Sequence, residues 1–146
     1  MRILIAATSA IAILATTAMA GPIEDRIALM KSNGQQMGIL APIAKGEKDF
    51  DAAVVKTALE QLAKNAEMLD PATLFPEGSD MGAETTAAPA IWEMPDEFMA
   101  KIEKFRADTA AAVAADPQDV ETFRAQFGTV ASNCGGCHQT FRVKKG

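Results

Sequence analysis

The sequence predicts an all-α protein in which four helices pack together as a bundle. The chain is rich in Ala, and no segment shows the alternating apolar pattern of a β-strand. Four segments instead repeat apolar residues at spacings of three and four, which places those residues on one face of each helix. A bundle buries such faces in its core, so the four segments are expected to pack against one another.

Two helices are predicted before residue 71. The apolar face of the first consists of Ile23, Ile27, Met30, Gly34 and Met37. The apolar face of the second consists of Val55, Leu59, Leu62, Ala66 and Leu69. Pro22 suits the first position of a helix, and Lys45-Gly46 suits a helix end. Asp51 can cap the second helix, which Asp70-Pro71 ends.

Two further helices are predicted after residue 95. The third has the apolar face Phe98, Ile102, Phe105, Thr109 and Ala112. The fourth has the apolar face Val120, Phe123, Phe127, Val130, Cys134, Cys137 and Phe141. Asp96 can cap the third helix, and Asp116-Pro117 offers a cap and a first-turn proline for the fourth. Between the second and third helices lies a long proline-rich connection, residues 71–95, expected to cover the core with Leu74, Phe75, Ile91 and Trp92.

The first twenty residues have the pattern of a secretory signal peptide. Arg2 supplies a positive charge, residues 3–14 are apolar, and Ala18-Met19-Ala20 forms a small-x-small cleavage site. The apolar stretch is too short for a typical membrane span, which leaves a membrane anchor as the weaker alternative. We therefore expect residues 21–146 to form one mature domain, exported to the periplasm and not inserted in the membrane.

One short motif carries the chemistry of this chain. Cys134-Gly135-Gly136-Cys137-His138 contains the only two cysteines and the only histidine of the sequence. This C-x-x-C-H pattern is the attachment signature of a c-type haem, in which each cysteine forms a thioether and the histidine ligates the iron. Positions i, i+3 and i+4 share one face of a helix, so all three side chains can meet one flat ring.

The other interpretations of this motif are weaker. A structural zinc site needs four ligands, and the chain offers three Cys and His residues. A thioredoxin-like dithiol expects a βαβ setting, and a disulfide across three residues closes too small a loop to stabilise much. Because Cys134 and Cys137 continue the apolar face of the fourth helix, we expect one haem c, held by two thioethers, inside the bundle. Gly34 and Gly38 of the first helix are expected to leave room for it.

The second axial ligand of the iron has to come from a different residue type. No second histidine exists, so the credible ligands are the methionines that survive signal removal, namely Met30, Met37, Met68, Met81, Met94 and Met99. Met30 and Met37 belong to the apolar face of the first helix. A core methionine that merely fills space remains the alternative for each of them.

Several segments resemble the class II c-type cytochromes, the cytochrome c-prime family. They are Pro89-Ala90-Ile91-Trp92, Leu74-Phe75-Pro76 and the haem motif near the C-terminus followed by Phe141-Arg142. The resemblance covers nearly the whole mature chain. It implies an antiparallel four-helix bundle with the covalent haem in its interior.

The first helix resembles one branch of this family most closely. The stretches 29–34 and 43–48 are similar to the low-spin branch, cytochrome c-556, in which the methionine that matches Met30 is the sixth iron ligand. Met37, two turns further along, is expected to face another part of the bundle. Arg26 resembles an arginine of the high-spin members, whose iron is five-coordinate.

Two functions follow from these alternatives. A haem ligated by His138 and Met30 has no open site and is expected to carry single electrons between other redox proteins. A five-coordinate haem would instead bind nitric oxide or carbon monoxide. No enzymatic activity is expected, because a peroxidase would want a distal acid–base residue and no second histidine is present. Arg26 and Arg142 are each expected either to neutralise a haem propionate or to remain solvated.

The net charge of the chain limits the classes of molecule that it is expected to bind. The whole chain has a formal net charge of −5, and removal of the signal peptide takes away one basic and no acidic residue. Nucleic acid is therefore excluded as a partner, and docking on basic patches of other redox proteins is favoured. Because members of the resembling family often pair through their first two helices, a homodimer is a further option.

Overall fold

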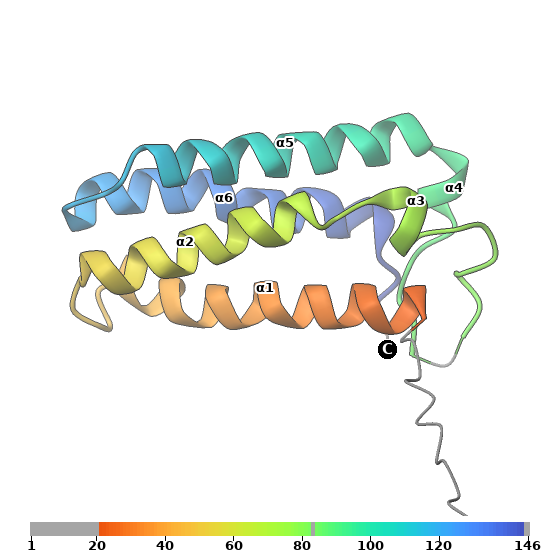
Figure 1. Ribbon diagram of the computed structural model, residues 1–146, viewed down its shortest axis with the longest axis horizontal. Coiled ribbons are helices and arrows are strands. Elements are labelled where there is room, and N and C mark those ends of the chain that lie inside the picture. Colours follow the sequence, from red (N-terminus) through yellow and green to blue (C-terminus); the bar gives the residue numbers. More distant parts are fainter. Residues whose placement is uncertain (1–20, 83, 145–146) are drawn as a thin grey trace, which may run out of the picture.

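The computed structural model describes residues 21–82 and 84–144, which fold into a four-helix bundle (Figure 1). The long helices are α1 (Pro22–Lys45), α2 (Ala52–Glu67), α5 (Pro95–Ala114) and α6 (Val120–Phe141). Each runs antiparallel to the long helix before it, and α1 and α5 both pack against α2 and α6 (Figure 1). The all-α bundle expected from the sequence is confirmed. The predicted signal peptide, residues 1–20, lies outside the described residues.

Local sequence signals account for the first two helices. Pro22 occupies the first position of α1, and Gly46 ends this helix with a φ of 77°, a conformation that glycine adopts at little cost. The side chain of Asp51 accepts hydrogen bonds from the backbone N–H groups of Ala53 and Val54, so it caps α2 as predicted.

The start of α6 differs from the sequence prediction. Asp119, not Asp116, is the cap, and its side chain accepts hydrogen bonds from the N–H groups of Glu121 and Thr122. Asp116 instead has a φ of 40° in the turn before Pro117, a conformation incompatible with a helix cap. The prediction failed because both aspartates carry a cap signal and only one of them stands in the right backbone geometry.

The connection between α2 and α5 is more ordered than a plain loop. It contains α3 (Pro71–Leu74), which Asp70 caps, and α4 (Ala90–Glu93). Leu74 and Ile91 are buried in the core, and Phe75 and Trp92 pack against it, as expected. α5 begins at Pro95, two residues earlier than predicted, because Met94 occupies the cap position and Asp96 lies inside the first turn.

The end of α6 is tied to this connection by backbone hydrogen bonds. The N–H of Ala88 donates to the carbonyl of Phe141 at 3.1 Å, and the N–H of Val143 donates to that of Thr86 at 2.9 Å. The helix that carries the haem motif is therefore fixed at its C-terminal end. Within the described part of the chain, no helix has the length and apolar character needed to cross a bilayer.

The core confirms three of the four predicted faces. All members of the α2 and α5 faces are buried, and so are Phe123, Phe127, Val130 and Phe141 of α6. The first helix is different, because its buried residues are Arg26, Leu29, Leu40 and Ile43. The predicted face of α1 is only partly covered by protein, and most of it borders a cavity.

Candidate haem site

A cavity of about 620 Å³ lies between α1, α5, α6 and the connection. Its size falls within the range of about 300–1,000 Å³ that is typical of small-molecule and cofactor sites. The walls are mainly apolar. Its lining includes Ile27, Met30, Gly34 and Met37 from α1, Phe98, Ile102 and Phe105 from α5, and Cys134, Cys137 and His138 from α6.

The structure brings all three residues of the haem motif to this one cavity. Cys134 and Cys137 are partly buried free thiols, and burial raises the pKa of each. Burial also lowers the pKa of His138, and the nearby cation of Arg142 lowers it further. His138 is therefore neutral at pH 7, which is the form of imidazole that ligates a metal.

Two methionines border the same cavity from α1. Met30 is placed as the sequence led us to expect, but the expectation that Met37 faces elsewhere is wrong. Seven residues make nearly two helical turns, so both side chains return to the same side of α1. The four other candidates, Met68, Met81, Met94 and Met99, are exposed and do not line the cavity.

The glycines of α1 behave differently from each other. Gly34 borders the cavity, and no atom lies within 4 Å of the position that a Cβ would take there. Space beside the cavity is therefore open at Gly34, as predicted. Gly38 is exposed and does not border the cavity, so its predicted contribution to that space is wrong.

Arg26 is neither solvated nor free. It is only 4% exposed, and its Nη1 donates to the carbonyl of Leu74 at 3.1 Å and to Ser79 Oγ at 2.8 Å. Its Nη2 donates to the Ser79 carbonyl and to Thr85 Oγ1, and its guanidinium lies 5.1 Å from the centre of the Phe75 ring. Burial lowers the pKa of Arg26. This arginine fastens the connection beside the cavity, a role that no local pattern in the sequence signals.

A second polar contact that the sequence did not reveal lies beside Cys134. Asn133 lines the cavity, and its Nδ2 donates to Asp108 Oδ2 of α5 at 2.7 Å. Asp108 also pairs with Lys104 at 2.6 Å, and its side chain is 18% exposed. The contact joins α5 to α6 directly before Cys134. Only the i, i+4 spacing of Lys104 and Asp108 was visible in the sequence.

The donor set fits a haem. The cavity combines apolar walls for a flat ring, two thiols at i and i+3 for vinyl addition, and a neutral imidazole with a thioether sulfur on another helix for the iron. Within residues 21–82 and 84–144, no group of three or more His, Cys, Asp or Glu is placed to hold a metal ion.

Comparisons with known proteins agree with this geometry. Cytochrome c-556 of Agrobacterium fabrum is 45% identical over 126 residues, which cover 86% of this chain and 84% of the relative. The structure of cytochrome c′ from Rhodopseudomonas palustris superposes with a TM-score of 0.81 at 37% identity, covering 88% of this chain and all of that one.

A second structural relative carries the name cytochrome c556. An NMR-validated structural model of oxidized cytochrome c556 from R. palustris has a TM-score of 0.74 at 33% identity, and the match covers 86% of this chain and 98% of that one. The family model described as cytochrome c′ matches residues 21–142. The chain therefore belongs to the cytochrome c′ family, and its cofactor is a covalently bound haem c.

Proposed function

We propose that this protein carries single electrons and that His138 and Met30 ligate its low-spin iron. Cys134 and Cys137 hold the haem by thioether bonds. One observation carries the proposal: Met30 on α1 lines the same cavity as the haem motif on α6. Relatives named cytochrome c-556 support it, as does the similarity of residues 29–34 to that branch.

The residues of this cavity suit electron transfer more than ligand exchange. When bound, the haem supplies an iron that gains and loses one electron. His138 offers a neutral imidazole nitrogen, and Met30 offers a thioether sulfur that favours the reduced state. Both stand on long helices of a packed bundle, so neither needs to move when the charge changes. The mainly apolar walls of the cavity would surround the ring of the haem.

The second candidate function is gas binding by a five-coordinate haem. It is favoured by the solved structures named cytochrome c′, such as that of R. palustris. In that case Met30 and Met37 would only pack against the ring, and the α1 side of the cavity beside Gly34 would admit nitric oxide or carbon monoxide. Either function is served by an exported protein, and we propose a periplasmic domain that begins near Gly21. Neither function includes an enzymatic reaction.

Two matched variants separate these functions. Met30→Ala should convert a low-spin spectrum into a high-spin one that binds carbon monoxide, because it removes the sixth ligand. Met37→Ala should leave the spectrum low-spin, although it removes the same side chain from the same cavity. An unchanged spectrum in Met30→Ala, or loss of the low-spin state in Met37→Ala, would assign the ligand to another residue. A wild-type spectrum that is already high-spin would favour gas binding.

A further inference from the structure

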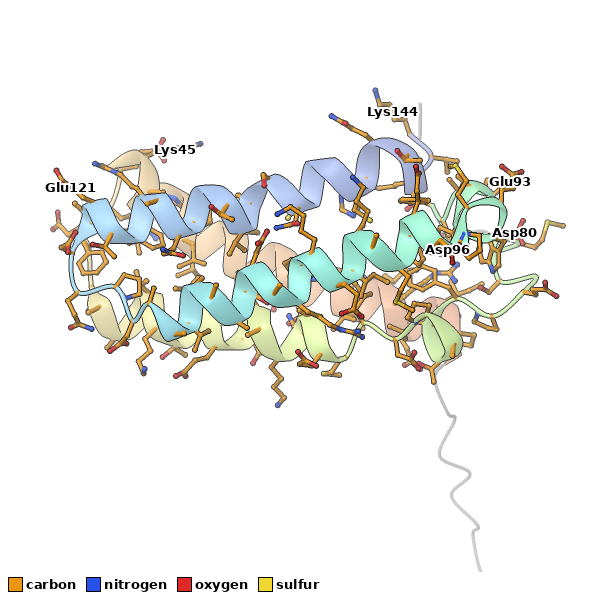
Figure 2. The ribbon with its side chains drawn as sticks, turned by 90° about the horizontal axis from the view of Figure 1, so that it is seen from above. Lys45, Asp80, Glu93, Asp96, Glu121 and Lys144 are labelled. Carbon is orange, nitrogen blue, oxygen red and sulfur yellow. The ribbon has the colours of Figure 1, made fainter. Side chains whose placement is uncertain are left out.

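The middle of α1 has few packing contacts although it carries both methionines of the cavity. The two ends of this helix are held: Arg26 binds the connection, and Arg124 Nε donates to the carbonyl of Ala44 at 2.7 Å. Figure 2 shows Lys45, the last residue of the helix, at the end of the bundle opposite the connection. Between these ends, every residue from 30 to 39 is at least partly exposed.

The cavity accounts for this lack of packing. Met30, Gly34 and Met37 line it, and the two methionines are only partly buried against the core. No atom lies within 4 Å of the position that a Cβ would take at Gly34. The position of this stretch therefore has to be set by contacts on another side of the helix, where α1 packs against α2 (Figure 1).

One buried side chain of α2 supplies such contacts. Asn65 is 2% exposed, and its Nδ2 donates to Ser32 Oγ and to Asn33 Oδ1, both at 2.8 Å. Gln61 Nε2 donates to Asn65 Oδ1 at 2.8 Å, so both ends of the Asn65 amide have partners. Within the part of the chain that the structure describes, no other side-chain hydrogen bond joins residues 30–39 to another element.

A buried amide between two helices fixes how they are aligned. If α1 slid along α2 or rotated against it, Asn65 would lose its partners, and a buried polar group without partners costs free energy. A single buried Asn sets the alignment of coiled-coil helices in the same way. The two residues that Asn65 contacts on α1 lie between Met30 and Met37, and one of them, Asn33, itself lines the cavity. The contact therefore holds the turn of α1 that follows Met30.

We propose that Asn65 is a positioning residue that keeps the sulfur of Met30 in place as the sixth ligand of the iron. This inference rests on the proposed ligation by His138 and Met30. Asn65 does not line the cavity, so it acts through Ser32 and Asn33 on the backbone of α1. Without this contact, α1 is free to move away from the iron, and the sixth position opens more often.

Imidazole titration of the oxidised holoprotein measures how often that position is open. Added imidazole binds where Met30 has left the iron, so its apparent affinity scales with the open fraction. Asn65→Leu keeps a side chain of similar shape and removes the amide. It should raise the apparent affinity for imidazole about tenfold, as expected for the loss of hydrogen bonds to α1. The midpoint potential should fall as well, since a methionine ligand raises it.

Three further variants separate positioning from a loss of stability. Val55→Ala is the matched control, because it removes buried volume from the same helix and no hydrogen bond to α1, and it should leave the affinity for imidazole unchanged. Asn33→Ala removes one of the two contacts and should raise the affinity about threefold, which provides a milder test if Asn65→Leu loses its haem. In a Met30→Ala background, Asn65→Leu should add nothing, because the ligand that it positions is absent.

The results that overturn the inference differ from those that overturn the proposed function. An unchanged affinity for imidazole in Asn33→Ala, an equal rise in Val55→Ala, or a further rise when Asn65→Leu is added to Met30→Ala would each show that Asn65 does not act through Met30. A high-spin wild type that binds imidazole as tightly as Met30→Ala would instead show that Met30 is no ligand, and the inference would fall with the proposed function.

Discussion

Arg26 is the charged side chain most deeply built into the fold. It is 4% exposed, and its hydrogen-bond partners are neutral oxygens of Leu74, Ser79 and Thr85. A buried cation is tolerated only when its N–H groups are well satisfied. These contacts join α1 to three points of the connection, in addition to the backbone hydrogen bonds that join the connection to the end of α6.

Removing this side chain should loosen the connection. Arg26→Ala is expected to lower the free energy of unfolding of the holoprotein by about 3 kcal/mol, since it leaves buried oxygens without donors. Denaturant unfolding followed by circular dichroism measures the loss. Arg124→Ala is the control, because Arg124 makes one exposed contact with the Ala44 carbonyl and should matter less. Equal stabilities of Arg26→Ala and the wild type would contradict this account of Arg26.

The residues of the site were predictable to different degrees. The cysteines and His138 follow from a contiguous motif, and Met30 follows from helical spacing together with the resemblance. Arg26 and the Asn133–Asp108 contact could not be found, because their partners are distant in sequence. Met37 was misplaced even though spacing alone puts it on the same side of α1 as Met30.

At the scale of elements, helix caps decide where the bundle turns. Asp51 accepts from two backbone N–H groups at the start of α2, directly after the turn that Gly46 opens. This is a local interaction that satisfies donors which the helix itself leaves unpaired. The first hairpin of the bundle is therefore defined by two residues readable from the sequence.

Substitutions of Asp51 test how much this cap contributes to stability. Asp51→Ala should lower the free energy of unfolding by about 1 kcal/mol, because two N–H groups lose their acceptor. Asp51→Asn keeps a capping oxygen and should change stability little. Thermal and denaturant unfolding of the two variants measures the difference. Similar losses in both would mean that the carboxylate charge, not the cap, is what stabilises α2.

Most of the fold could be predicted because each long helix carries a local apolar pattern. The short helices α3 and α4 could not, since four residues are too few to show a period. The start of α6 was misplaced because Asp116 and Asp119 are both plausible caps, and only Asp119 has the extended backbone conformation of a helix cap. The partial exposure of the apolar face of α1 could not be predicted either, because this face lines the cavity instead of packing against another helix.

At the scale of the whole molecule, the haem is part of the core. The bundle surrounds a cavity of about 620 Å³ lined by three of its four long helices. A void of that size weakens a protein because its walls lose packing contacts. The stable form of the bundle is therefore the one that contains the cofactor.

Covalent attachment can be tested on the intact protein. Acid–acetone treatment of the wild type should leave the haem colour with the polypeptide, because thioethers at Cys134 and Cys137 resist extraction. Replacing both cysteines with alanine should yield little stable holoprotein, and any haem retained should be extractable. Extractable haem in the wild type would contradict attachment at these two residues.

The most direct test of the central claim is the visible spectrum of the purified wild-type protein in both oxidation states, with and without carbon monoxide. A haem ligated by His138 and Met30 should be low-spin and six-coordinate in each state, and carbon monoxide should leave the reduced spectrum unchanged. A high-spin spectrum that shifts at once on addition of carbon monoxide would contradict the electron-carrier account.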